Sequence, residues 1–240
     1  MDKKQEIILG FSTGALHKTQ LSLVDRLALM HSLGCNAVEL GSIRKDDFIK
    51  TEFLSEEVRN MLKNFDYVSV HSPKLSYRKD NETLGILDKI ELLHYLRPLD
   101  LVVFHPDQIV DFSVFDLVSF PVGFENMDSR KSFGRNPEDL DPIFARNTPF
   151  KFVLDMNHIL SNDPTLQLAK CFLDRFRDRL VQIHLSGYVG YHEPLFMTRQ
   201  TELIRLAYSL NVPIIIESVL RPEQLFLEKD YIERTVLDLE

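Results

Sequence analysis

Short apolar runs alternate with amphipathic stretches along this chain. The runs are rich in Val, Ile and Phe, which is typical of parallel strands covered on both faces. Eight of them are predicted to be strands: residues 7–11, 37–40, 67–70, 101–104, 122–124, 150–154, 180–183 and 212–216. Because the stretches between them have helical periodicity, the pattern predicts an α/β fold, the (β/α)8 TIM barrel.

The first amphipathic stretch has clear start and stop signals. Ser22 with Asp25 three positions later predicts a capping pair at its beginning, and Gly34 predicts its end. Its apolar stripe consists of Leu23, Val24, Leu27, Met30 and Leu33.

Two later helices are predicted to start where a capping residue precedes proline. These positions are Asn136 before Pro137 and Asp163 before Pro164. The segment 109–120, between the fourth and fifth strands, is short for a helix. We therefore expect the fourth crossover to be abbreviated.

The length, charge and cysteine content limit the classes of protein to which this chain can belong. A length of 240 residues suits a single barrel domain spanning residues 1–240, and a formal net charge of -8 provides no overall basic field for nucleic acid or an acidic membrane. Cys35 and Cys171 have no CxxC spacing, so neither a disulfide framework nor a thiolate metal site is indicated. No run reaches the roughly 20 apolar residues of a membrane span, and the N-terminal run is too short for a signal peptide. We expect a soluble protein of the reducing cytoplasm, without a membrane partner.

Candidate chemistry lies where the strands end. In a barrel of this type the carboxyl ends of all strands open onto one face, so side chains that follow them converge. A metal cluster requires neutral imidazoles and carboxylates that arrive from different directions. His192, in the loop beyond the seventh strand, lies where it could add a further ligand. Seven of the eight strands are followed at once by a possible ligand: Glu39, His71, His105, Glu125, Asp155 with His158, His184 and Glu217.

Each of these residues also has a structural interpretation. Asp155 could cap a helix and leave His158 on the surface, and Glu125 could cap in the same way. Glu217 follows a strong apolar run, where an unpaired carboxylate is costly, although a structural salt bridge would satisfy it. Three histidines follow no strand and are expected to be structural or exposed: His17, His31 and His94.

The series VSVHSP, VVFHPD, GFENMD, LDMNH, IHLSG and IIIES resembles the superfamily of xylose isomerase-like TIM barrels. That superfamily includes endonuclease IV, of the family-2 apurinic/apyrimidinic endonucleases, and sugar isomerases and epimerases. The resemblance covers essentially the whole chain through the order of the motifs. It implies a tetrad around a central metal that is shared by both branches, so the tetrad alone does not choose a reaction. Its members here would be Glu125, Asp155, His184 and Glu217.

The additional histidines resemble the endonuclease branch. By that resemblance His71 and His105 would join a bridging Glu125 at a second metal, and His158 with His192 would match ligands of a third. The endonuclease has an aspartate two positions before the last histidine, where this chain has Gly190. We therefore expect two metals more firmly than three. The HPDQ and FENMD segments also resemble ultraviolet-damage endonucleases.

Two enzymatic functions follow. The hydrolase hypothesis, which the histidines favour, has one to three divalent ions, Zn²⁺ or Mn²⁺, that activate water and bind a small phosphate ester. Arg130 and Lys131 would then neutralise charge, or belong to a solvated loop. The alternative is a sugar or sugar-phosphate isomerase or epimerase with Glu125 and Glu217 as acid and base. A third hypothesis is an inactive binding protein on the same barrel.

The substrate-binding residues are expected on neighbouring loops. Glu39 would contact substrate or neutralise a cation within the barrel. Abasic DNA would need a wedge and a basic track. The loop PKLSYRK offers Lys74 and Tyr77 for these roles, although an exposed loop is the alternative. Arg44 and Lys45 lie on a second loop, where two aspartates offset their charge.

Overall fold

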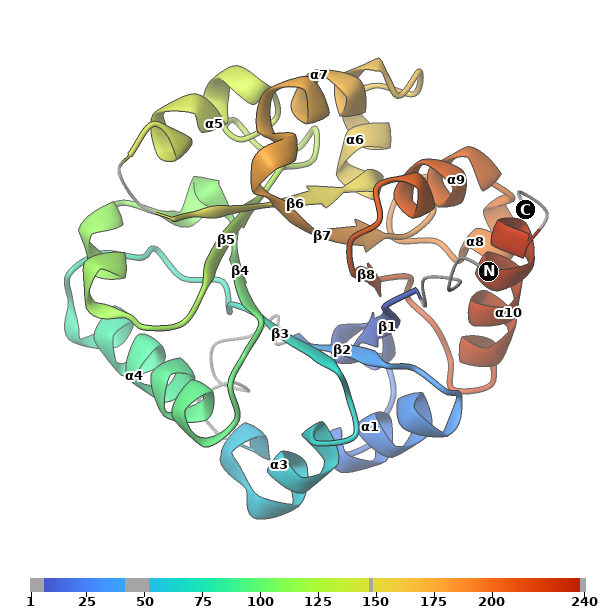
Figure 1. Cartoon of the computed structure of the whole chain (residues 1–240), viewed down its shortest axis with the longest axis horizontal. Helices are drawn as coiled ribbons and strands as arrows, with labels where there is room; N and C mark the ends of the chain where they lie inside the picture. The colour runs from blue at the N-terminus through green and yellow to red at the C-terminus, as the bar shows by residue number, and fades with distance from the viewer. Residues whose placement is uncertain (1–6, 42–51, 147–148, 238–240) are drawn as a thin grey trace, which may run out of the picture.

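The computed structural model describes residues 7–41, 52–146 and 149–237. Its eight parallel strands form a closed barrel in which each strand pairs with the next along the chain and the last pairs with the first (Figure 1). The predicted fold class is therefore confirmed. The strands are β1 (Leu9–Ser12), β2 (Ala37–Gly41), β3 (Tyr67–His71), β4 (Leu101–Phe104), β5 (Val122–Glu125), β6 (Lys151–Asp155), β7 (Leu180–Leu185) and β8 (Ile214–Ile216).

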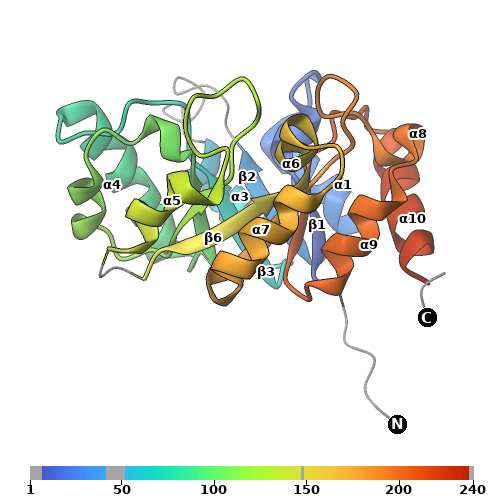
Figure 2. The same cartoon turned by 90° about the horizontal axis from the view of Figure 1, so that it is seen from above.

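Helices surround this barrel, and long loops follow β5 and β7 on the same side of it (Figure 2). The α-helices are α1 (Leu23–Ser32), α3 (Glu56–Leu62), α4 (Asn81–Leu96), α5 (Pro137–Phe144), α6 (Met156–Asn162), α7 (Gln167–Phe176), α8 (Leu195–Thr198), α9 (Thr201–Ser209) and α10 (Gln224–Leu237). The 3₁₀ helices are Thr13–Leu16, Glu52–Leu54, Pro106–Gln108, Phe112–Leu117 and Arg177–Arg179. In the described residues, no helix is both long and apolar enough to cross a membrane.

Local sequence signals set several of these boundaries. The hydroxyl of Ser22 accepts the N–H of Asp25 at 3.1 Å and the Asp25 carboxylate accepts the N–H of Ser22, which confirms the capping pair of α1. Gly34 follows this helix with a φ of +73°, a conformation that glycine adopts without strain. Pro137 is the first residue of α5, as predicted.

The predicted helix start at Asp163 is wrong. The N–H of Asp163 donates to the carbonyl of Ile159, so this residue closes α6 instead. Its carboxylate accepts the N–H groups of Thr165 at 2.9 Å and Leu168 at 2.8 Å, which builds a turn between two helices. As a result α7 begins only after Leu166, which has a φ of +61°.

The fourth crossover is abbreviated, as expected. Between β4 and β5 it contains only the 3₁₀ helices Pro106–Gln108 and Phe112–Leu117. Aromatic rings take the place of a helix in covering these strands. Phe115 lies 4.8 Å from Phe104 and 5.6 Å from Phe124, measured between ring centroids.

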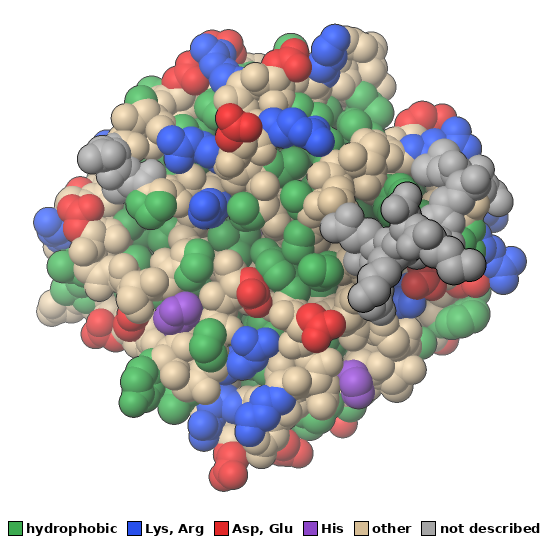
Figure 3. Space-filling view, in the orientation of Figure 1, with side chains coloured by type: hydrophobic (Ala, Val, Ile, Leu, Met, Phe, Trp, Pro, Cys, Tyr) green, Lys and Arg blue, Asp and Glu red, His purple; other side chains and the backbone are tan. Residues whose placement is uncertain are grey.

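The interior of the barrel changes in character along its axis. An apolar layer, which includes Leu101, Val153 and Ile215, fills it among the strands. Another set of buried side chains is polar, including Glu39, Gln182 and His184. On the face visible in Figure 3, basic and acidic side chains are interspersed, with no continuous basic area. That face is the amino-terminal end of the barrel, opposite the carboxyl ends of the strands. The candidate site is marked by the buried polar side chains of the interior.

Candidate functional site

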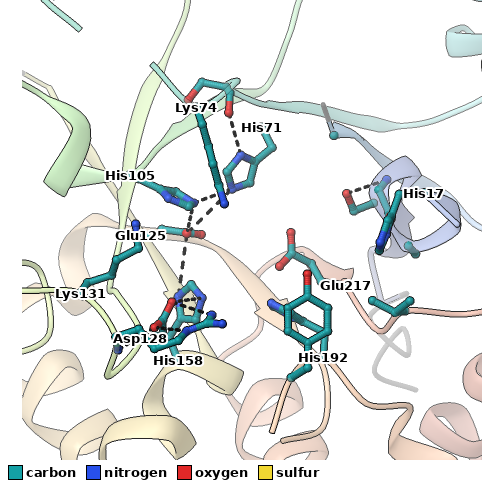
Figure 4. Close-up of a pocket in the computed structure, with 18 residues that line it drawn as sticks. His17, His71, Lys74, His105, Glu125, Asp128, Lys131, His158, His192 and Glu217 are labelled. Carbon is teal, nitrogen blue, oxygen red and sulfur yellow. Dashed lines mark hydrogen bonds and ion pairs between the residues drawn. The ribbon is translucent and has the colours of Figure 1, made fainter. Parts of the chain in front are cut away.

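A pocket of about 260 Å³ lies over the carboxyl ends of the strands (Figure 4). Asp155 and His184 are buried beside it, within 4 Å of pocket residues. The predicted site residues that line it are His71, Lys74, His105, Glu125, Arg130, His158, His192 and Glu217. The converging arrangement expected of strand-end ligands is therefore present for this set.

One group of ligand atoms comes from β3, β4 and β5. His105 Nε2 lies 2.8 Å and His71 Nε2 3.8 Å from Glu125 Oε1. The two Nε2 atoms are 3.2 Å apart. All three side chains direct one ligand atom to the same point, an arrangement that fits a divalent cation.

A second group surrounds the other oxygen of the same glutamate. His184 Nδ1 lies 2.8 Å from Glu125 Oε2, 3.7 Å from Glu217 Oε1 and 3.9 Å from Asp155 Oδ2. Among the described residues, the buried atoms His184 Nδ1, Glu125 Oε2 and Asp155 Oδ2 have no aligned hydrogen-bond partner. A cation placed among these atoms would be contacted by both carboxylate oxygens and the imidazole nitrogen, so a bound cation fits this group as well.

The pKa values of the buried groups also indicate that this cluster attracts positive charge. Burial raises the pKa of Glu217 to about 7, and the neighbouring carboxylates of Glu39 and Asp155 add to this. Burial also raises the pKa of Asp155. For His184 burial acts in the opposite direction, but Glu217 and Glu39 raise its pKa well above the usual value. A divalent cation can replace the protons that this cluster attracts.

Glu39 lies below the pocket rather than in it. Its side chain is fully buried, and Oε2 is 3.1 Å from His184 Nε2. The same oxygen accepts the Ser69 hydroxyl at 3.0 Å and the Gln182 amide at 2.8 Å. Of the two roles expected from the sequence, this depth fits neutralising a cation within the barrel better than contacting a substrate. His184 Nε2 also lies 2.7 Å from the Gln182 amide nitrogen. In the tautomer in which Nε2 donates to Glu39, Nδ1 keeps a lone pair for a cation.

Substitution of Glu39 tests this supporting role. Glu39→Gln is expected to weaken metal binding by about tenfold to a hundredfold, because the charged acceptor that orients His184 is lost. Metal affinity measured by chelator competition checks the effect. Glu228→Gln is the matched control, since Glu228 is equally buried but bonds to the N–H groups of Leu195 and Phe196. Equal affinities for the two variants would contradict the role.

Asp155 both caps a helix and faces the ligand group around His184, and His158 lines the pocket. The Asp155 carboxylate caps α6 by accepting the N–H of His158 at 2.7 Å, while its second oxygen faces His184. His158 Nδ1 donates to the carbonyl of Asn126 at 2.8 Å. Its Nε2 faces Asp128 Oδ2 at 3.9 Å, so this imidazole is buried in the pocket wall and not on the surface.

His192 is carried by a tightly bonded loop over the pocket. Gly187 and Glu193 pair across its base, and the Glu193 carboxylate accepts the N–H groups of Val189, Gly190 and Tyr191. The His192 ring lies 6.1 Å from that of His158 and bonds through Nδ1 to Ser186 at 3.0 Å. Asn157 adds bonds to the carbonyls of Gly187 and Tyr191. The loop therefore holds His192 in a defined position.

Tyr77 does not reach the pocket. Its side chain is fully buried, its hydroxyl donates to the carbonyl of Pro73 at 2.8 Å, and its ring packs on Phe104. A backbone bridge to Ile109 draws this part of the loop into the core, so Tyr77 is unsuited to be a wedge into DNA. Arg44 and Lys45 lie outside the described residues.

Several pocket residues were not anticipated from the sequence, among them Asp128, His17 and Tyr191. Asp128 is buried and pairs with Arg130 at 2.8 Å. His17, expected to be structural or exposed, is exposed but also lines the pocket, as does Tyr191. The sequence did hold a signal for Asp128, because it follows Glu125 by the same three positions that separate His158 from Asp155.

No protein-family model and no curated protein matches this chain. Several solved structures are similar in fold. Endonuclease IV from Thermus thermophilus has a TM-score of 0.73 at 16% identity, over 96% of this chain and 99% of its own. The 3-keto-D-glucoside 4-epimerase YcjR from E. coli has a TM-score of 0.65 at 14% identity, over 95% of this chain and 100% of its own.

A third similar structure is the probable 3-DHS dehydratase AsbF from Bacillus anthracis. Its TM-score is 0.64 at 13% identity, over 95% of this chain and 98% of its own. Three different reactions are thus named among proteins that share this architecture. At such identities the likeness shows the fold alone: this chain is a (β/α)8 barrel, as these proteins are.

Proposed function

We propose that this protein is a divalent-metal-dependent enzyme that hydrolyses a phosphate ester. The observation that carries the proposal is the position of Glu125. One of its oxygens faces His71 and His105, while the other faces His184, whose Nδ1 also lies within 4 Å of Asp155 and Glu217. A carboxylate between two ligand groups is the arrangement expected of a bridge between two cations.

The residues divide into clear roles in this proposal. His71, His105 and Glu125 hold one cation, and Glu125, Asp155, His184 and Glu217 hold the other. Bound divalent cations supply Lewis acidity, which activates water and stabilises negative charge on a phosphate. Arg130 and Lys131 add positive charge at the pocket wall. The solved endonuclease IV of similar fold supports a phosphoester substrate.

The ligand set for a third cation is incomplete. His158 and His192 face the pocket, but Gly190 provides no carboxylate beside them. Burial and the neighbouring His158 lower the pKa of His192 to about 3, which keeps this imidazole neutral near pH 7. In the two-metal proposal, these histidines instead bond to the substrate or to water.

Sugar isomerisation or epimerisation is the second candidate. The 3-keto-D-glucoside 4-epimerase of similar fold supports it. Glu125 and Glu217 both approach His184 Nδ1, at 2.8 Å and 3.7 Å, so two carboxylates flank one cation position and suit a pair of proton-transfer groups. An inactive binding protein is less favoured, because several carboxylates buried together around His184 are costly to keep without a cation.

Metal content separates the two candidate reactions. Protein purified without chelators or an affinity metal is expected to contain two ions per chain under the hydrolase proposal. His105→Ala should then remove one of the two ions and reduce phosphate-ester hydrolysis about a hundredfold or more, because the first ligand group loses one imidazole. Mass-spectrometric metal analysis and phosphatase assays with small esters and an abasic oligonucleotide provide the measurements.

His31→Ala is the matched control for that variant. His31 lies on α1 and packs against Phe65, away from the pocket, so its loss should change neither metal content nor turnover. One exchangeable ion in the native protein, unaffected by His105→Ala, would contradict the hydrolase proposal. That result would favour the isomerase and direct the search to ketoses and their phosphates.

A further inference from the structure

Lys74 is the cation at the mouth of the pocket that has no ionic partner in the described part of the chain. Three Lys and Arg side chains line the described pocket. Arg130 pairs with Asp128 at 2.8 Å, and Lys131 pairs with Asp107 at 2.7 Å. Figure 4 shows the Lys74 side chain extending into the pocket from the loop after β3, toward His71 and His105.

This position favours an anionic ligand. Lys74 points into the pocket and has no ion pair to a described carboxylate, so its ammonium is available to an anionic ligand there. The Lys74 ammonium has three donors on a flexible stem, a form in which lysine binds phosphate as a point charge. A phosphate held here would lie between this ammonium and the metal ligands of the pocket.

The size and charge of the pocket favour a small ligand. Its volume of about 260 Å³ lies just below the range of about 300–1,000 Å³ for drug-sized ligands. The chain has a formal net charge of -8, and the other two described cations of the pocket are already paired with carboxylates. A nucleic-acid strand would require a longer basic track.

We infer that Lys74 binds the phosphate group of a small phosphate monoester, such as a sugar phosphate, at the mouth of this pocket. The inference rests on the proposed function and specifies its substrate class. It assigns recognition of the anionic group to the loop after β3, while the strand-end ligands provide the reaction centre.

Binding measurements test this without requiring turnover. The metal-containing protein is titrated by calorimetry with ribose 5-phosphate, with ribose and with an abasic oligonucleotide at physiological ionic strength. Ribose 5-phosphate is expected to bind the native protein at least about tenfold more tightly than ribose, and Lys74→Ala should remove about tenfold of that affinity. Lys79→Ala is the matched control, since Lys79 is exposed on the same loop but does not line the pocket.

Each other outcome overturns the inference. Equal binding of ribose and ribose 5-phosphate would mean that the phosphate is not recognised. A preference for the phosphate that survives in Lys74→Ala would place the anion on the metals alone. Lys74-dependent binding of the oligonucleotide, without binding of ribose 5-phosphate, would identify a nucleic-acid site instead. If Lys74-dependent binding is found but no phosphate ester is hydrolysed, only the hydrolase proposal fails.

Discussion

Glu125→Gln is expected to reduce turnover by about a thousandfold or more and to lower the affinity for both cations. The substitution keeps the shape of the side chain but removes the charge and replaces one ligand oxygen with an amide nitrogen, which cannot bind a cation. Because Glu125 contributes an oxygen to each ligand group, one substitution affects both. Metal analysis and steady-state kinetics on the same preparation measure the two effects together.

The metal content of His105→Ala provides a comparison for Glu125→Gln. His105 contacts one Glu125 oxygen only, so its loss should spare the ion beside His184. Near-ultraviolet circular dichroism of each variant checks that the fold is intact. If Glu125→Gln retained two tightly bound ions, Glu125 would not be the bridge and the two-metal proposal would fail.

Removal of metal is expected to lower the thermal stability substantially. At a free metal concentration a hundred times Kd, binding to the folded state adds about 2.7 kcal/mol per site. For a chain of this length each kcal/mol corresponds to about 2–4 °C in Tm, so one occupied site is worth about 5–10 °C. Differential scanning fluorimetry with EDTA and then with excess Zn²⁺ or Mn²⁺ measures the shift.

Asp155→Asn is the appropriate control for this shift. Asparagine preserves the helix cap that Asp155 provides to His158, but it removes the charge that faces His184. This variant should lose most of the stabilisation that a cation in the ligand group around His184 provides. Its metal-free Tm should stay close to that of the native protein. An identical metal-induced shift in both proteins would place the bound ion elsewhere.

The strand-end pattern was sufficient to predict the barrel and most of the side chains that converge on the pocket. Parallel strands buried on both faces have apolar runs long enough to recognise, and their common direction fixes where the following side chains meet. The depth of each side chain was harder to predict. Glu39 lies within β2, two residues before its end at Gly41, whereas Glu125 is the last residue of β5. That difference places Glu39 beneath His184 and Glu125 beside it.

Loop residues were predicted least well, because their positions depend on individual side-chain and backbone contacts that hydrophobic periodicity does not reveal. Tyr77 is drawn inward by its bridge to Ile109, and Asp128 is positioned by Arg130 and its approach to His158. Neither partner has a periodic relation to the residue that it positions. The turn formed by Asp163 follows the same principle, since a single carboxylate accepts two N–H groups beyond the proline.

The loop that carries His192 also affects how this site can change by substitution during evolution. Its shape is fixed by the Glu193 carboxylate and by Asn157, and neither bond involves a side chain at position 190. A Cβ at Gly190 would meet nothing nearer than Glu193 Oε1 at 4.0 Å. A single substitution can therefore add or remove a carboxylate here without remodelling the loop. Under the metal proposal, the number of cations that such a barrel holds could change without a change of the scaffold.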